Sequence, residues 1–311
     1  MSRNAAIIAA TLLAGAAAVF AIVNAPNVGP DFKPIVPAPG YEHDRWKTTP
    51  RDIVTEFRAY ITSFDSADDN DGDGTPDKWA IPEWVSYEMR KLDGPLGPAP
   101  GRPSKWITIP ELFQQGIAPS DDSYHFPQAW RTANPDHPLN DFDRGHMCMK
   151  QHAFRLGADA DWNTHTVLNA CPQKKDLNSG IWQRLENQTA AWADEYGKVW
   201  IICGPVVFNH KPKLWLFGPE GEGDDEVPVA IPDAFFKIVV KDREGSNVPD
   251  VLAFLFPQKG VDYSHSRDGE FLPHLTSVDT IEALTGLDFF TVLPSAGQEA
   301  IEEMIAVELW N

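Results

Sequence analysis

The chain has 311 residues, of which 42% are hydrophobic and 23% charged, an ordinary composition for a globular protein of one large domain or two modest ones. Its 27 prolines argue against a helical bundle, because they favour long ordered loops and extended linkers. The net charge of -19 argues against a polyanionic partner, although eleven of the acids lie in residues 65–77 and 220–226, and removing them brings the balance to -8.

The N-terminus carries an almost unbroken apolar run from Ala5 to Val23, preceded by Arg3. Such a run is typical of an export signal, and it is about long enough to cross a bilayer as a helix. Val23-Asn24-Ala25 resembles a cleavage site, but Pro26 would hinder cleavage. Residues 1–25 are therefore either a signal peptide or an uncleaved anchor through residues 5–23, and the protein is expected to be exported, secreted or periplasmic.

Two segments with a different character follow the apolar run. Residues 26–50 are rich in proline and predict an extended tether. Residues 51–100 are interpreted as an N-terminal extension that opens with an amphipathic helix over residues 51–64. The main domain is expected to occupy residues 101–311, after a second proline-rich link.

An Asp-rich loop in this extension has the spacing of a calcium site. Oxygen ligands at alternate positions, followed by a glycine that permits a sharp turn, match the first nine positions of an EF-hand loop. The twelfth position is Ala80 instead of Glu, so a solvated acidic loop is the alternative. We expect a structural Ca²⁺ ion on Asp69, Asp71, Asp73 and Asp77.

The main domain alternates short strands with helices. A short strand is predicted at residues 166–168, and apolar spacing predicts a helix over residues 178–196 that ends at Gly197. Further elements are predicted as strands over 198–203, 235–241 and 251–257 and as helices over 277–287 and 297–309. Turn-rich loops rather than crossover helices join the strands, which favours an α+β fold with a mixed, mainly antiparallel sheet flanked by helices.

One set of motifs contains the candidate catalytic and metal-binding residues. It begins with Asp143-Arg144-Gly145-His146 and continues with Asn178 and Glu186. These motifs resemble the DNA/RNA non-specific endonuclease family, which includes Serratia-type secreted nucleases and mitochondrial endonuclease G. The resemblance extends in order over residues 103–310 and implies a ββα-metal site.

The residue types suit phosphodiester hydrolysis. Asn178 and Glu186 are eight residues apart and would share one helix face, where they offer oxygen atoms to Mg²⁺ or Mn²⁺. His146 can accept a proton at neutral pH, so it is the candidate general base. Arg144 lies two residues before His146 and would reach the same side of an extended segment, where it could hold phosphate.

The resemblance adds further expectations. It implies that Asn178 binds the metal directly, that Glu186 acts through water, and that Asn169 supports the site by hydrogen bonds. Cleavage of DNA and RNA would leave 5′-phosphate ends, by a monomer or a homodimer. Some family members use an additional upstream arginine, for which Arg102 and Arg131 are both candidates. The alternatives are a catalytically inactive nuclease-like binding module and a phosphodiesterase for smaller substrates.

Three cysteines, Cys148, Cys171 and Cys203, lack the spacing of a zinc site. In an exported protein they suggest one disulfide and one free thiol. Three pairings are open, and Cys148–Cys171 is favoured because both residues flank the expected active site.

Overall fold

The computed structural model describes residues 37–310 except for 51–52, 66–77, 125–127, 136–137, 217–226 and 267–269. The apolar run at residues 5–23 and the predicted calcium ligands Asp69, Asp71, Asp73 and Asp77 lie outside these described residues. Within the described part of the chain, no helix is both long and apolar enough to cross a membrane.

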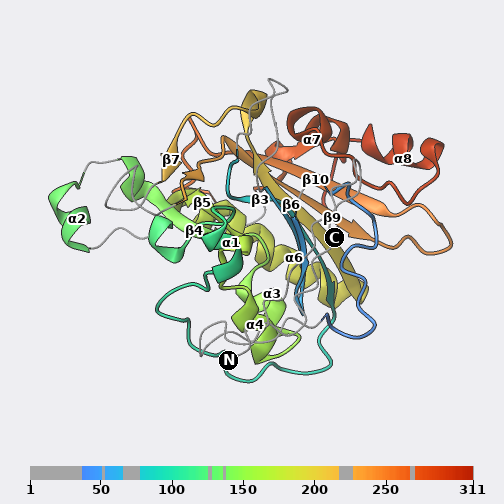
Figure 1. Cartoon of the computed structure of the whole chain (residues 1–311). Helices are drawn as coiled ribbons and strands as arrows, with labels where there is room; N and C mark the ends of the chain where they lie inside the picture. The colour runs from blue at the N-terminus through green and yellow to red at the C-terminus, as the bar shows by residue number, and fades with distance from the viewer. Residues whose placement is uncertain are drawn as a thin grey trace, which may run out of the picture.

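A seven-stranded antiparallel sheet forms the centre of the fold (Figure 1). Its strand order is β1-β2-β3-β6-β9-β10-β11. The strands are β1 (Ile53–Glu56), β2 (Ile61–Phe64), β3 (Pro82–Arg90), β6 (Lys198–Val206), β9 (Ala234–Lys241), β10 (Asp250–Pro257) and β11 (Leu275–Thr276). The predicted α+β fold with a mainly antiparallel sheet is confirmed.

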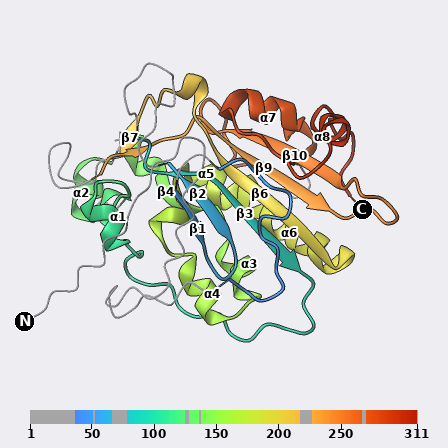
Figure 2. The ribbon, with the colours of Figure 1, turned by 45° about the vertical axis from the view of Figure 1, so that its right-hand side comes forward.

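Both faces of this sheet are buried, because side chains alternate between two hydrophobic clusters along each strand. In β9, Phe235 and Val239 belong to one cluster, whereas Phe236 and Ile238 belong to the other. Helix α6 (Gln183–Tyr196) packs on the first face, and α7 (Val278–Thr285) and α8 (Ser295–Glu302) pack on the second (Figures 1 and 2).

Most of the remaining elements surround the first face, whereas η5 (Phe208–His210) lies against α7 on the second. β4 (Phe142–His146) and β5 (Ala170–Lys174) form a separate antiparallel pair, and β7 (Trp215–Leu216) pairs with β8 (Val229–Ala230). The short helices near them are α1 (Pro110–Gln114), α2 (Gln128–Ala133), α3 (Lys150–Phe154), α4 (Ala158–Asn163) and α5 (Lys175–Leu177). Single helical turns of other types lie at η1 (Asp121–Tyr124), η2 (Pro138–Asp141), η3 (Val167–Asn169), η4 (Asn178–Trp182), η5 (Phe208–His210) and η6 (Leu272–His274).

The N-terminal part differs from the sequence expectation. The helix predicted over residues 51–64 is wrong: this segment forms the hairpin β1–β2, because its β-branched residues pair with the sheet. The boundary expected near residue 100 does not separate β3 from the rest, since Val85 to Arg90 pair with Lys198 to Cys203 of β6.

The part of the expected tether that the structure describes is also packed. Trp46 is 6% exposed and its ring centroid lies 5.7 Å from Trp200 and 6.0 Å from Phe290. Through Trp46, this segment therefore contributes to the second hydrophobic cluster instead of forming an extended link.

Several predicted elements change at their ends. The strand predicted at 166–168 is the single turn η3, and the strand predicted over 198–203 continues through Gly204-Pro205 to Val206. The helix predicted over 277–287 is confirmed as α7, which Ser277 caps at its start and left-handed Gly286 ends. The last helix, α8, is shorter than predicted and ends at Glu302.

Candidate active site

A pocket of about 320 Å³ lies where β4 meets the start of α6. Four of the predicted site residues, Arg144, His146, Asn178 and Glu186, line it together. The other lining residues include Arg102, Trp106, Tyr124, Arg131, Phe142, Asp143, Met149, Lys150, Gln151, Ser179 and Gln183.

His146 ends strand β4, two residues after Arg144, so the two side chains extend from the same side of the strand. The intervening Gly145 is required by packing, because a Cβ at this position would collide with the Gln173 side chain of β5. The sequence Arg-Gly-His thus brings two functional side chains to the pocket while the backbone stays close to β5.

The His146 ring packs against two other rings, which also lie against each other. Its centroid is 4.4 Å from Trp106 and 5.2 Å from His165. Its Nε2 atom is buried and has no hydrogen-bond partner among the described residues. Burial lowers the pKa of His146 well below its usual value, and the positive groups nearby act in the same direction. The imidazole is therefore neutral at neutral pH and has one nitrogen able to accept a proton, although the same shift makes it a weaker base than an exposed histidine.

Asn169 is fully buried and does not line the pocket. Its Oδ1 accepts a hydrogen bond from the Cys148 N–H at 2.8 Å, and its Nδ2 donates to the carbonyl oxygens of Cys148 at 2.9 Å and Thr164 at 3.0 Å. Asn169 therefore fixes the backbone two residues beyond His146.

Asn178 and Glu186 reach the pocket from two different kinds of helical turn. Residues 178–182 form the wide turn η4, which is interrupted at Gly180 (φ −101°, ψ −118°), and regular α-helix begins at Gln183. The single regular helix predicted over residues 178–196 is therefore wrong at its start, although Gly197 does end it with a positive φ.

Glu186 is 4% exposed, and its Oε1 has no hydrogen-bond partner among the described residues. Burial raises the pKa of Glu186 to about 7, against the opposing charge of Lys237, whose Nζ lies 3.7 Å from Oε1. A carboxylate oxygen and the amide oxygen of Asn178 in one pocket are the donor types that Mg²⁺ prefers, so these residues fit a divalent cation.

Cationic side chains gather at the same pocket. Arg102, Arg131, Arg144 and Lys150 all line it. Arg144 forms an ion pair with Asp121, and Lys150 forms one with Asp161 at 2.9 Å. The sequence identified Arg144 but not its partner Asp121, and both upstream arginine candidates reach the pocket.

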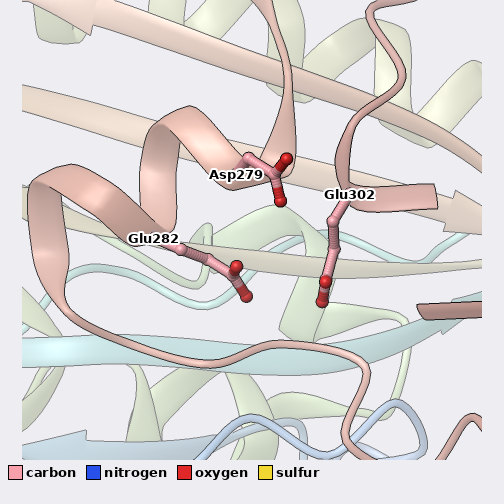
Figure 3. Close-up of side chains that lie close together, drawn as sticks. All are labelled: Asp279, Glu282 and Glu302. Atoms are coloured by element: carbon pink, nitrogen blue, oxygen red, sulfur yellow. The ribbon is translucent and has the colours of Figure 1, made fainter. Parts of the chain in front are cut away.

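A second acidic group lies on the opposite face of the sheet (Figure 3). One carboxylate oxygen from each of Asp279, Glu282 and Glu302 lies within 4.8 Å of the others. Burial raises the pKa of Glu282 to about 7, and the charges of Glu302, Asp288 and Asp279 add to this effect. The group belongs to α7 and α8 and takes no part in the pocket.

Sequence reasoning missed three aromatic or charged neighbours of the site: Trp106, His165 and Lys237. His165 belongs to no motif, yet its ring contacts His146. Lys237 had a readable signal, because it is a single charge inside the apolar run Phe235-Phe236-Lys237-Ile238-Val239-Val240. Trp106 lies outside any motif and could be placed only by the fold.

The predicted disulfide is absent from the structure. Cys148, Cys171 and Cys203 are all free and buried. The register explains this result: Cys171 faces Gly145 across the β4–β5 pair, whereas Cys148 lies beyond the end of β4.

Comparisons with known proteins agree with the motif. The family described as DNA/RNA non-specific endonuclease matches residues 80–296. The nuclease of Serratia marcescens is 30% identical over 226 residues, which cover 70% of this chain and 72% of that protein. The mitochondrial nuclease EXOG of Mus musculus is 26% identical over 212 residues, 68% of this chain and 52% of that protein.

The chain thus spans about half the length of the EXOG relative. A chain in the crystal structure of the EndoG/EndoGI complex has the same fold, with a TM-score of 0.55 at 18% identity, covering 78% of this chain and 87% of that one. These matches confirm the family resemblance drawn from the Asp143-Arg144-Gly145-His146 motif and its helix.

Proposed function

This chain belongs to the DNA/RNA non-specific endonuclease family, a family of hydrolases, and from that premise we propose that its pocket cleaves DNA and RNA with His146 as general base. The observation that carries the proposal is the unpartnered, buried Nε2 of His146 in the pocket that Asn178 and Glu186 also line. The 5′-phosphate ends are part of the same proposal.

Each residue at the pocket has a separate role in the proposed cleavage. His146 Nε2 accepts a proton from the attacking water as its oxygen bonds to phosphorus. The bond from phosphorus to the 3′ oxygen breaks, and the 3′ oxygen leaves and takes a proton from solvent water. Arg144, supported by Arg102 and Arg131, offers guanidinium donors to the phosphate. Asn169 holds the backbone beyond His146 and so fixes the base.

Asn178 would hold a Mg²⁺ ion, or Mn²⁺, with Glu186 acting through water. Such an ion supplies positive charge that stabilises the phosphate as negative charge develops on it. We also propose that cleavage has little sequence preference. Three further expectations remain predictions. They are a Ca²⁺ ion at Asp69–Asp77, export through residues 1–25 with or without a retained membrane anchor, and assembly as a monomer or a homodimer.

The test is cleavage of plasmid DNA and of RNA by purified protein lacking residues 1–25, with Mg²⁺ or EDTA. We expect both substrates to be degraded with Mg²⁺ and to survive in EDTA. His146→Ala should lose about 100-fold or more of the activity, because the general base is gone. His274→Ala is the matched control: it is a partly buried histidine outside the pocket, and it should retain activity.

Inactivity of the folded wild-type protein towards both polymers, with Mg²⁺, Mn²⁺ and Ca²⁺ each supplied, would contradict the proposal. Nucleic-acid binding without cleavage would then favour the inactive binding module. Hydrolysis of a small phosphodiester such as bis(p-nitrophenyl) phosphate, with both polymers left intact, would favour the alternative enzyme.

A further inference from the structure

Lys237 is a buried cation in the middle of the central sheet. Its side chain is 0% exposed, and β9 lies between β6 and β10, so strands cover it on both sides. Its neighbours along the strand are Phe236 and Ile238. An ammonium group removed from water is costly unless it is paired, so this position needs a reason beyond packing.

The Lys237 ammonium has two partners on one helical segment. Its Nζ lies 3.7 Å from Glu186 Oε1 and 3.9 Å from the ring centroid of Trp182. Trp182 and Glu186 are four residues apart, so Lys237 contacts the face of α6 and its preceding turn that is turned towards the sheet. Among the described residues, Nζ has no hydrogen-bond acceptor and Glu186 Oε1 has no donor.

The pair connects the sheet to the pocket. Glu186 lines the pocket together with His146 and Asn178, whereas Lys237 does not line it and lies behind Glu186. Lys237 is also the one described cation in an ion pair with Glu186, since the adjacent His152 has a pKa lowered to about 3 by burial and is neutral.

Stability alone does not account for this pair. A buried ion pair is often no more stabilising than apolar side chains of similar size, because desolvation offsets the attraction. Apolar residues occupy the equivalent inward positions Phe235 and Val239 on the same strand face. A charge at position 237 is therefore better explained by its interaction with the Glu186 carboxylate.

We propose that Lys237 is a positioning residue of the active site, whose buried ammonium holds the Glu186 carboxylate in place for the divalent cation. The inference rests on the proposed function, because it assumes a cation at Asn178 and Glu186. Lys237 touches neither substrate nor cation, and it acts through Glu186 alone.

The test is Mn²⁺ binding to the full chain, measured by isothermal titration calorimetry without substrate. The site of interest is defined as the binding lost in Asn178→Ala, which separates it from any other cation site. Lys237→Met should weaken this binding about tenfold or more, the usual effect of losing a residue that orients a metal ligand.

Lys241→Met is the matched control. Lys241 lies on the same face of β9, four residues away, next to Tyr196 (4.2 Å) and paired with Asp250 (3.2 Å), but outside the pocket. Its Mn²⁺ affinity should stay within about twofold of wild type, because no residue that orients a metal ligand is lost. If Lys237→Met does not fold, Lys237→Gln, which is also uncharged, gives the same comparison.

The double variant Glu186→Gln/Lys237→Met tests whether Lys237 acts on the metal site through Glu186 or by disturbing the structure generally. Because Lys237 acts through Glu186, it should bind Mn²⁺ as weakly as Glu186→Gln alone. Wild-type Mn²⁺ affinity in a folded Lys237→Met or Lys237→Gln protein would overturn the inference, and so would a further loss in the double variant. Unchanged binding in Asn178→Ala would instead contradict the metal site of the proposed function.

Discussion

At the scale of single residues, Asn169 shows how a side chain outside the pocket can hold the backbone beside it. Its three hydrogen bonds satisfy the N–H and C=O of Cys148 and the C=O of Thr164, all of them buried. Asn169→Ala leaves these groups without partners and should lower the free energy of unfolding by about 2–4 kcal/mol, measured by urea denaturation.

The control is Asn187→Ala, an exposed asparagine on α6, which should change stability by less than about 0.5 kcal/mol. Since Asn169 fixes the backbone beyond His146, the folded Asn169→Ala protein should also lose kcat more than it changes KM. Equal stability of the two variants would show that Asn169 is not a structural support.

The sequence could identify these residues but not their surroundings. The motif predicted Arg144, His146, Asn178 and Glu186 as one site, and the structure places all four at one pocket. It could not identify Asp121 as the partner of Arg144, Trp106 as its neighbour, or Lys237 as the neighbour of Glu186, because these contacts join residues 23 to 51 positions apart. Burial and pairing are properties of the fold, and no spacing rule encodes them.

At the scale of elements, the α7–α8 layer holds more negative charge than its surroundings can solvate. Burial and the charges of Glu302, Asp288 and Asp279 raise the pKa of Glu282 to about 7. Between the ordinary pKa of about 4.5 and this value, the folded protein keeps a proton that the unfolded chain has released. The free energy of unfolding should therefore fall as pH rises from about 4.5 through about 7.

Glu282→Gln tests this pH dependence. A neutral amide still accepts the Phe289 N–H hydrogen bond, which is 2.8 Å long in the wild type, and it removes the charge that forms at high pH. The melting temperature should rise by about 1–3 °C at pH 8.5 and change less at pH 5. Glu299→Gln, on an exposed position of α8, should show no such difference between the two pH values. An equal shift of Glu282→Gln at both pH values would rule out the titration.

Elements were predicted well where local patterns and tertiary contacts agree. The strands β9 and β10 and the caps Ser277 and Gly286 follow from apolar runs and capping residues. Residues 51–64 were mistaken for a helix because their pairing with β3 depends on a segment about twenty residues later. The break at Gly180 lies where an added Cβ would meet the carbonyl oxygen of Tyr263 at 3.3 Å, a tertiary contact that helical spacing cannot predict.

At the scale of the whole molecule, charge is distributed unevenly. The chain has a net charge of -19, yet Arg102, Arg131, Arg144 and Lys150 meet at one pocket. An acidic surface with a locally cationic pocket can still bind phosphate, because attraction at contact distance outweighs screened repulsion from distant groups. The negative net charge is therefore compatible with a polyanionic substrate.

The three cysteines belong to the same single core. Cys148, Cys171 and Cys203 are all 0% exposed and lie in the hydrophobic cluster under α6. Burial raises the pKa of each thiol, that of Cys203 to about 12, so little reactive thiolate forms at neutral pH. The core is packed with thiols and does not depend on a disulfide for its stability.

This arrangement predicts how the whole chain responds to reductant. In the native protein a thiol reagent such as DTNB should react slowly, and after unfolding without reductant it should titrate all three cysteines. Dithiothreitol should leave the urea midpoint unchanged, because there is no cross-link to remove from the unfolded chain. A single titratable thiol, together with a midpoint that falls in dithiothreitol, would instead support the one disulfide expected from an exported sequence. The count of thiols in the unfolded protein separates these outcomes, since slow reaction in the native state follows from burial in either case.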